Sequence, residues 1–335
     1  MVAYSDRLEW YRVLEERLEA KIVCYVTGDR PGLETQISAE VLDFIVDHLD
    51  LLSMPNRISL FLYTRGGNTL AGWSVINLMR QFCKELYVIV PAKALSTGTL
   101  MCLGADVILM TKQATLGPID PSVNGPLCPA IAGAPPHARA PVSVEAVRGF
   151  IDLAKNELGI ASESQLAEVL SKLADAVHPL VLGDVYRIRD QIRMLARRLL
   201  SNQLKDSEKL EQIISFLCSD SGSHDYTIDR REARDRLGLN VMKPDDGLYG
   251  IIKRIYDDIR ADLRLSIPLD PNVVLGHQDH VDYSFQRALI ESVTGGSHAF
   301  ISEGCFKKHA LMTSDGIAQT AIEDRRTFEG WRRAV

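Results

Sequence analysis

Short apolar runs alternate with amphipathic segments along the first third of the chain. The runs Lys21–Val26, Arg57–Tyr63 and Leu86–Val90 are rich in branched and aromatic residues, which is typical of buried strands. Between them, Ser38–Leu51 and residues 75–82 carry apolar side chains at helical spacing. Strands that alternate with helices form βαβ units around a parallel sheet. The pattern therefore predicts an α/β fold.

The remainder of the chain is predicted to be mainly helical, with two irregular stretches. Asp120–Pro141 is rich in proline, alanine and glycine and predicts a long loop, interpreted as a lid or substrate-binding segment. Asp270–Val335 is polar and mixed, with no clear period. Helices are expected at residues 5–20, Val144–Leu158, Glu163–Leu173, Gly183–Asn202, Ser207–Ser219 and Lys243–Leu265.

A serine lies at a junction between a predicted strand and a predicted helix. Ser96 follows the run Leu86–Val90 and precedes an apolar segment that begins at Leu100. Backbone N–H groups at a helix N-terminus are unpaired and attract an anion, which is what an acyl-transfer nucleophile needs beside it. The alternative is that Ser96 only caps the helix, a common role for serine.

A second feature lies at the same predicted edge of the sheet. The strand Arg57–Tyr63 ends at Thr64-Arg65-Gly66-Gly67-Asn68, and a helix follows. Two glycines permit positive φ and close backbone approach, which leaves N–H groups free to face a ligand. Because ligands bind outside the carboxyl ends of parallel strands, this turn and Ser96 are expected to form one site.

These motifs resemble those of the Clp-type peptidase and crotonase superfamily, and most closely the serine dehydrogenase proteinase group near signal peptide peptidase A. Leu62–Gly67 is similar to the family's strand and glycine turn, and Leu95–Leu100 to its nucleophile turn. The segments that follow also resemble the family in order, and the similarity covers roughly residues 20–240. They are Gly104–Met110, Ala114–Pro121 and Ser223–Ile228.

The resemblance implies a ClpP/crotonase-like fold of repeated β-β-α units with a parallel sheet, a helical handle and a C-terminal extension. It implies a serine peptidase in which Ser96 is the nucleophile and the amides of Gly67 and Thr97 are the oxyanion donors. Gly66 belongs to the same substrate-binding turn. A peptide or protein substrate would lie as an added strand beside it.

The general base is not fixed by the resemblance. Clp-type relatives carry a histidine on the strand after the nucleophile, where this chain reads Leu116-Gly117-Pro118. His224 and Asp225 are the predicted base and acid, because Asp225 falls where the family's catalytic aspartate falls. Neighbours on an extended segment point to opposite faces, so these two side chains do not readily pair. The alternatives are His178, His137, Lys93 and Lys155, since related signal peptide peptidases use a lysine.

A different class of function stays open beside the peptidase. Crotonase relatives use paired amides on a thioester, so an acyl-CoA enzyme or a catalytically weak scaffold of the same fold is the alternative. The serine at the turn favours the peptidase, whereas the missing histidine favours the scaffold. Labelling by a fluorophosphonate separates the two.

Composition and charge limit the classes of function and the cellular location that the sequence allows. The chain has 335 residues, 46% hydrophobic and 24% charged, with a net charge of −6, which argues against binding to nucleic acid. No apolar run is long enough to span a membrane, and no signal peptide is expected. The six cysteines lack metal-ligand spacing, so a reducing cytoplasm with no metal and no cofactor is expected.

The domain organisation follows from the resemblance. Residues 1–240 are expected to form the peptidase domain, with a lid and handle insertion at residues 121–183. Residues 241–335 are expected to form a mostly helical or irregular extension. The helix Gly183–Asn202 resembles the contact element of ring-forming relatives, which predicts a homo-oligomer.

Overall fold

The computed structural model describes residues 4–220, 223, 225–312 and 318–334. The chain divides into two compact units. The first combines Met1–Leu116 with Ile228–Val335, and the second is Gly117–Thr227.

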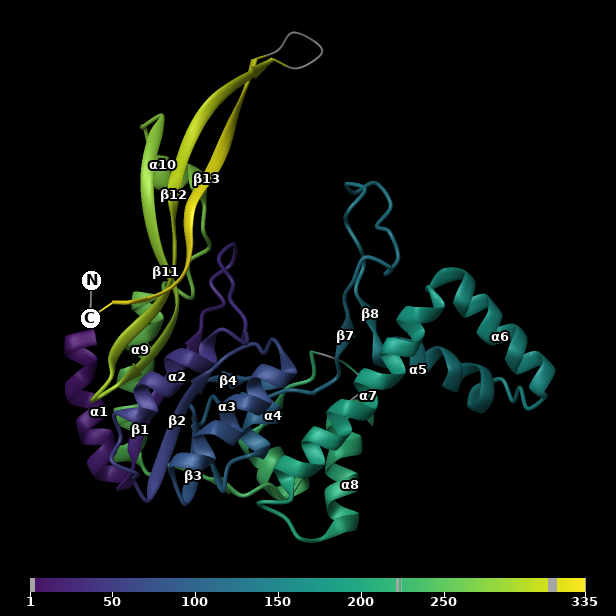
Figure 1. Cartoon of the computed structure of the whole chain (residues 1–335), viewed down its shortest axis with the longest axis horizontal. Coiled ribbons are helices and arrows are strands. Elements are labelled where there is room, and N and C mark those ends of the chain that lie inside the picture. The colour runs from purple at the N-terminus through teal and green to yellow at the C-terminus, as the bar shows by residue number, and fades with distance from the viewer. Residues whose placement is uncertain (1–3, 221–222, 224, 313–317, 335) are drawn as a thin grey trace. The chain divides into compact units, whose positions relative to one another are not determined.

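An eight-stranded mixed sheet organises the first unit (Figure 1). Its order is β10-β5-β3-β2-β1-β11-β12-β13, and the strands from β10 to β1 are parallel. These five strands are β1 (Lys21–Thr27), β2 (Arg57–Tyr63), β3 (Glu85–Val90), β5 (Val107–Met110) and β10 (Val241–Met242). A smaller sheet joins β4 (Lys93–Ala94), β6 (Thr115–Leu116) and β9 (Ile228–Asp229). The α/β class and its parallel βαβ units are therefore confirmed.

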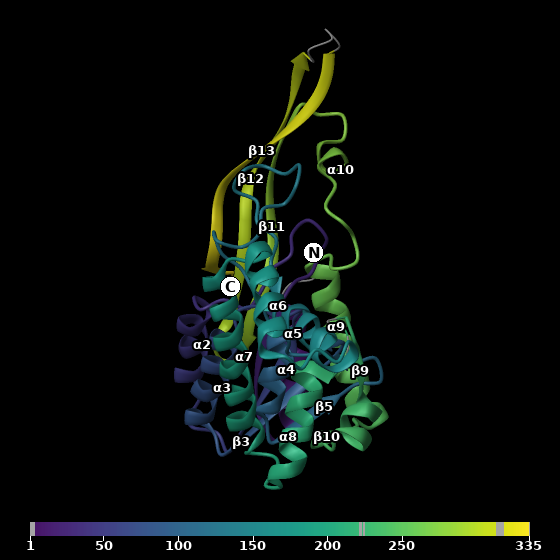
Figure 2. The same ribbon diagram turned by 90° about the vertical axis from the view of Figure 1, so that its right-hand side faces the viewer.

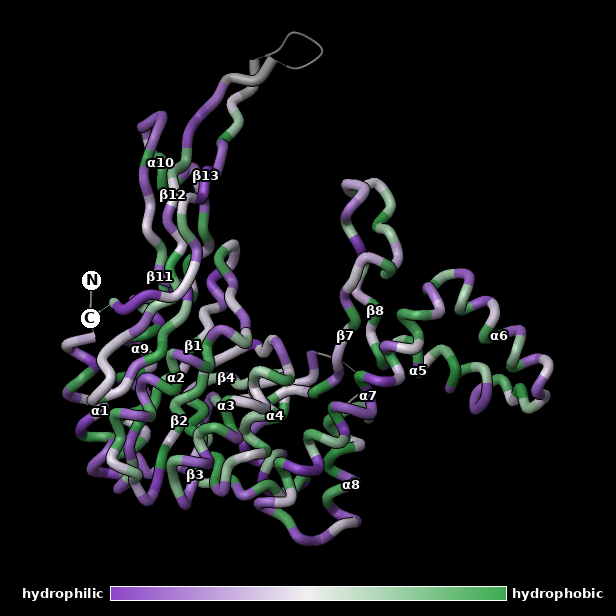
Figure 3. Tube along the Cα trace, in the orientation of Figure 1, coloured by the Kyte–Doolittle hydropathy of each residue, from purple (hydrophilic) through white to green (hydrophobic). Residues whose placement is uncertain are grey.

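Helices cover both faces of the parallel part of the sheet (Figure 1). On one face, α1 (Tyr4–Leu18) and α9 (Asp246–Asp262) pack against alternate strand residues such as Ile22 and Phe61. On the other lie α2 (Val41–Asp50), α3 (Thr69–Phe82) and α4 (Thr97–Leu103). Because both faces are buried, the strands are almost wholly apolar, as the green segments in Figure 3 show. A π-helical turn, η3 (Glu232–Arg236), precedes β10.

The C-terminal region differs from the expectation. Residues 241–335 do not form a mostly helical or irregular extension, because three long antiparallel strands follow the helices α9 and α10 (Pro271–Leu275). They are β11 (His280–Ser292), β12 (Gly296–Met312) and β13 (Ala318–Arg333). The predicted boundary after residue 240 is also wrong, because β11 pairs with β1 inside the same sheet.

We call the part of β11–β13 that continues past the end of β1 the arm (Figures 1 and 2). Only Ala288–Ser292 of β11 pair with β1, and there the strand is fully buried. In the arm, β11 and β12 mix buried, half-buried and exposed positions, and the described residues of β13 are all half-buried or exposed, which explains the mixed polar sequence. A cluster of Leu275, Tyr283 and Phe306 packs α10 against the arm.

The second unit is mostly helical. Its helices are α5 (Val144–Asp152), α6 (Glu163–Ala176), α7 (Pro179–Leu200) and α8 (Ser207–Ser215), with π-helical turns at Leu153–Glu157 and Phe216–Asp220. β7 (Ser122–Val123) lies within the predicted loop and pairs with β8 (Val142–Ser143), which directly follows the loop. No helix in the described residues is long and apolar enough to cross a membrane.

A buried histidine pair fastens β11 and β12 to α2. His48 is fully buried; its Nδ1 lies 2.7 Å from Ser292 Oγ and its Nε2 lies 3.0 Å from His298 Nδ1. Burial, with His298 and Arg333 nearby, lowers the pKa of His48 to about 4. The folded state therefore holds His48 neutral.

We expect this pair to make stability fall in mild acid. Since the folded pKa lies below the unfolded value near 6.5, the stabilisation is complete above pH 6.5 and is lost as the pH falls toward 4. At pH 5, protonation of His48 alone is expected to lower the free energy of unfolding by about 2 kcal/mol. Urea unfolding of the wild type at pH 7.5 and pH 5 measures this loss. His48→Gln tests the assignment, and His137→Gln, at an exposed histidine, is the control. An equal pH dependence in wild type and His48→Gln would contradict the assignment.

Candidate active site

Ser96 lies in a strained turn between β4 and α4. Its φ is 52° and its ψ is −115°, a conformation that L-residues rarely adopt and that costs about 1–3 kcal/mol. Although Ser96 is the N-cap residue of α4, its side chain makes no capping hydrogen bond. Its backbone carbonyl accepts from the N–H of Leu100 at 3.1 Å, which holds the turn. The hydroxyl of Ser96 is therefore half-buried and is not used to cap the helix.

The glycine turn after β2 lies directly against Ser96. Gly66 has a φ of 110°, and a Cβ built on it would lie 2.9 Å from Ser96 Cβ and 3.3 Å from Ser96 Oγ. Its N–H donates to Thr64 Oγ1 at 2.9 Å, so this amide is used within the turn. The role of Gly66 is thus close approach to Ser96, with its amide engaged elsewhere.

Ile37 sets the orientation of the next residue, Gly67. The N–H of Ile37 donates to the carbonyl of Gly66 at 2.9 Å, and its carbonyl accepts from the N–H of Asn68 at 2.8 Å. This parallel bridge turns the N–H and C=O of Gly67 to the opposite side. There Thr97 Oγ1 donates to the carbonyl of Gly67 at 2.7 Å, which ties the turn to the residue after Ser96.

Two backbone amides beside Ser96 are unpaired. Within the described part of the chain, the N–H of Gly67 donates to no acceptor. Among the residues that the structure describes, the N–H of Thr97 also has no acceptor, because Thr97 is the first residue of α4. A hydroxyl flanked by two free N–H groups is the arrangement that attacks an acyl carbon and stabilises the resulting oxyanion. The structure thus brings together Ser96, Gly66, Gly67 and Thr97.

Among the predicted bases, only Lys93 lies in the same unit. Its Nζ bonds Asp29 Oδ2 at 2.8 Å and lies 5.5 Å from the centre of the Tyr63 ring. The Tyr63 hydroxyl donates to the other oxygen of Asp29 at 2.7 Å. The Nζ of Lys93 is thus engaged by Asp29, which argues against a role as base for Ser96.

The other candidate bases belong to residues 117–227. His224 falls outside the described residues. Asp225 is exposed, and its N–H donates to Ser223 Oγ at 3.2 Å. His178 caps α7 through its Nδ1, which accepts from the N–H of Leu180 at 3.2 Å. Lys155 and His137 are exposed. No described residue accepts a hydrogen bond from Ser96 Oγ.

Sequence reasoning missed two residues of this site, Ile37 and Thr64. Thr64 is the first residue of the segment that contains the glycine turn, so its position in the sequence could have indicated a role for its hydroxyl. Ile37 had none, because it reaches the turn through a pairing between segments about thirty residues apart.

The described residues offer one group able to hold a metal ion. Its members are His280, Asp282 and Cys305, whose ligand atoms lie within 4.8 Å of one another. They lie on β11 and β12, and none belongs to the turns around Ser96. Lys307 and Arg325 stand opposite His280 and Cys305 in the sheet, and their charges disfavour a cation there.

Comparisons with known proteins agree with the resemblance. Residues 40–137, which contain the glycine turn and Ser96, match the family of ClpP-like SDH-type serine proteinases. The uncharacterized protein MJ0137 of Methanocaldococcus jannaschii is 28% identical over 184 residues, 55% of this chain and 53% of that protein. MJ1495 of the same organism is 37% identical over 67 residues, 20% of this chain and 23% of that protein. The chain thus spans about half the length of the first relative and less of the second.

The chain is also similar to solved structures of other proteins. A mutant of the 1510-N membrane-bound stomatin-specific protease is 16% identical, with 68% of this chain and 83% of that chain covered and a TM-score of 0.40. ClpP1 from Listeria monocytogenes is 18% identical, with 70% and 99% covered and a TM-score of 0.36.

Proposed function

We propose that this chain, whose residues 40–137 match the ClpP-like SDH-type serine proteinases, hydrolyses peptide bonds through an acyl-enzyme on Ser96. The observation that carries the proposal is the strained Ser96 turn beside the unpaired amides of Gly67 and Thr97. Strain of this kind persists where the surrounding structure fixes it, and it clusters at functional sites.

The reaction proceeds in two steps. Ser96 Oγ loses its proton to a base and attacks the carbonyl carbon of the scissile bond. The carbonyl oxygen becomes an oxyanion that accepts hydrogen bonds from Gly67 and Thr97. Collapse breaks the C–N bond, and the amine leaves with a proton. Water then attacks the ester in the same way, which releases the acid and restores the Ser96 hydroxyl.

The substrate lies on the open side of the glycine turn. Ile37 already pairs with one side of Gly67, so a peptide cannot add there. On the other side the Gly67 amide is free, and an extended peptide carbonyl can accept from it. The substrate is thus recognised first through its backbone.

We infer that His224 or Asp225 supplies the base, as the resemblance implies. His224→Ala and Asp225→Ala are each expected to lower turnover by at least about 10²-fold. If His224 takes the proton, the rate rises with pH as an imidazole loses its proton. Turnover of a peptide substrate across pH, with Lys155→Ala and His178→Ala as the comparison, measures this. Full activity in both the His224 and Asp225 variants would turn the assignment to Lys155 and His178.

One observation favours the alternative, a catalytically weak scaffold or an acyl-CoA enzyme. No described residue is hydrogen-bonded to the Ser96 hydroxyl, and a serine without a base is a poor nucleophile. A fluorophosphonate probe separates these functions, because it phosphonylates only an activated serine. We expect the mass of one adduct on the intact protein, located at Ser96 by peptide mapping. Ser284→Ala, at an exposed serine on β11, should label like wild type. An unlabelled wild type would favour the alternative.

A homo-oligomeric state and a cytoplasmic location stay predictions from the sequence. Exposed large apolar side chains in residues 117–227 support the first of them. Leu180 is 65% exposed and Tyr186 is 66% exposed, and both lie on α7, the helix expected to make subunit contacts. Covering such side chains with a second copy removes apolar surface from water.

A further inference from the structure

A β-bulge in β11 places an arginine at the base of the arm. In the pairing of β11 with β12, Gln286 stands opposite Ile301 and Ala288 opposite Phe300. Arg287 is therefore the extra residue of the bulge. Bulges redirect a side chain and occur preferentially near active sites. Here the bulge directs the Arg287 side chain out of the regular ladder.

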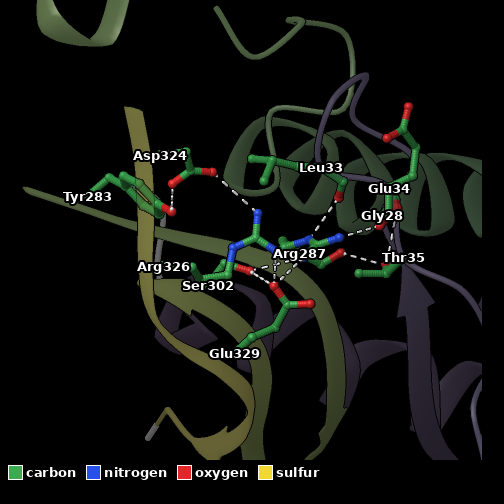
Figure 4. Close-up of polar contacts among 10 residues, drawn as sticks. All are labelled: Gly28, Leu33, Glu34, Thr35, Tyr283, Arg287, Ser302, Asp324, Arg326 and Glu329. Carbon is green, nitrogen blue, oxygen red and sulfur yellow. Dashed lines mark hydrogen bonds and ion pairs between the residues drawn. The ribbon is translucent and has the colours of Figure 1, made fainter. Parts of the chain in front are cut away.

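The guanidinium of Arg287 binds the loop between β1 and α2 (Figure 4). Its Nε donates to the carbonyl of Leu33 at 3.0 Å, and its Nη2 donates to the carbonyl of Glu34. The planar guanidinium has several donors in a fixed geometry, so hydrogen bonds to two successive carbonyls fix the direction of that backbone segment. The single amine of a lysine could not do this. The side chain of Arg287 thus fixes the backbone of residues 33–34 through two hydrogen bonds.

The arm holds the other side of the same guanidinium. Nη1 of Arg287 lies 3.0 Å from Ser302 Oγ on β12 and 3.1 Å from Glu329 Oε2 on β13. Glu329 also pairs with Arg326, which in turn pairs with Asp324 (Figure 4). The Arg287 side chain is only 11% exposed, so water screens these contacts weakly. All three arm strands therefore fix its position.

The backbone of Arg287 holds the loop a second time. Its carbonyl accepts from the N–H of Gly28 at 2.8 Å and from Thr35 Oγ1 at 3.1 Å. Thr35 also closes the loop on itself, because its N–H donates to the carbonyl of Gly28 at 2.8 Å. A Cβ on Gly28 would lie 2.4 Å from the Arg287 carbonyl oxygen, so only glycine permits this approach. Both ends of residues 28–35 are thus attached to β11.

This loop leads directly to the glycine turn. Two residues after Thr35, Ile37 makes the pair of hydrogen bonds that bracket Gly67. Those bonds are what turn the free Gly67 amide toward the Ser96 side. A shift of the loop would move Ile37, and with it the direction of the amide. Because donors act only when aimed at the developing oxyanion, a small misdirection reduces the rate.

We propose that Arg287 is a positioning residue that couples the arm to the oxyanion turn through the loop of residues 28–37. The proposal rests on the proposed function of Ser96 and extends it to a residue that touches no substrate. The coupling acts on the transition state more than on substrate binding, because Ile37 orients a donor and contributes no substrate contact. An arm that is bound or bent by another molecule would alter the rate by the same route.

The test compares three variants with a matched control. Arg287→Ala removes the guanidinium, and Arg287→Lys keeps the charge near Glu329 without its planar geometry. Thr35→Val removes the hydroxyl bond to the Arg287 carbonyl and leaves the bond from the Gly28 N–H. The control is Arg332→Ala, which removes another arginine of β13; it pairs with Glu303 at 3.0 Å, and no contact with the loop is found among the described residues. We expect Arg287→Ala and Arg287→Lys to lower kcat about 10-fold or more with little change in KM, and Thr35→Val to lower it less. Arg332→Ala should keep the wild-type kcat.

Hydrogen exchange supplies a measurement that needs no activity. In Arg287→Ala and Arg287→Lys, peptides that cover residues 33–38 and 64–69 should exchange faster, whereas peptides from α9 should not change. Arg332→Ala should leave the first two peptides at the wild-type rate. Wild-type exchange in them with Arg287 replaced would overturn the coupling, even if Ser96 proved unreactive. Faster exchange with an unchanged kcat, in an enzyme whose Ser96 is shown to react with the fluorophosphonate probe, would overturn the positioning role. If Arg287→Ala does not fold, the kcat and the hydrogen exchange of Arg287→Lys and Thr35→Val test the proposal.

Discussion

Ser96→Ala is expected to lower peptide hydrolysis by at least about 10³-fold while leaving the fold intact, because the acyl-enzyme cannot form without the hydroxyl. Alanine tolerates the φ of 52° no worse than serine does. The hydroxyl also has no hydrogen-bond partner among the described residues, so its loss leaves no polar group unsatisfied. We therefore expect a change in unfolding free energy within about 0.5 kcal/mol.

Turnover of a fluorogenic peptide and urea unfolding of the same preparations measure both quantities. Ser284→Ala serves as the control, since it removes an exposed hydroxyl from β11. Hydrolysis by Ser96→Ala at a rate close to wild type would reject Ser96 as the nucleophile. A large loss of stability would instead mean that the hydroxyl has a structural role.

Gly67→Ala is expected to remove roughly 10²-fold or more of the activity. Gly67 has a φ of 145°, and a Cβ on it would lie 2.4 Å from both the N and the O of Ile37. Backbone atoms cannot yield as a flexible side chain can, so the bridge to Ile37 must open. The amide of Gly67 then loses its direction toward the oxyanion, and removal of one such donor costs about 10²–10³-fold in kcat.

Gly250→Ala is the matched control, because a Cβ at this position of α9 meets nothing within 4 Å. It should keep full activity and gain slightly in stability, since alanine favours a helix over glycine. Kinetics and thermal unfolding of the two variants measure the difference. If Gly67→Ala keeps the wild-type kcat at an unchanged Tm, the turn is not part of the catalytic machinery.

The sequence predicted best where local pattern and tertiary burial agree. The strand Arg57–Tyr63 has the same bounds in the structure, and Glu85–Val90 differs from its prediction by one residue. Both strands are buried on two faces, so their apolar runs are unbroken and their ends are marked by turns. The Gly66-Gly67 turn and Ser96 meet as expected because parallel strands bring their carboxyl ends to one edge.

The same reasoning failed for the C-terminal strands. β12 and β13 are 17 and 16 residues long. The described residues of β12 mix buried, half-buried and exposed positions, and none of the described residues of β13 is buried. Charged residues on the exposed positions broke the apolar alternation from which strands are recognised. Their pairing is also remote in the chain, as Val23 of β1 stands opposite Ser292 of β11. Sequence pattern carries little information on such contacts.

The sequence by itself determined the α/β class and the βαβ order, because both depend on short-range spacing, and that order placed Ser96 and the Gly66-Gly67 turn at one edge of the sheet. The roles expected for the amides of Gly67 and Thr97 came from the family resemblance. Only the tertiary structure decided that Lys93 is held by Asp29, that Ile37 turns the Gly67 amide, and that Arg287 holds the loop from a bulge. Such features depend on which distant segments become neighbours. That choice is made by the burial and backbone pairing of the whole sheet, which no local stretch of the chain encodes.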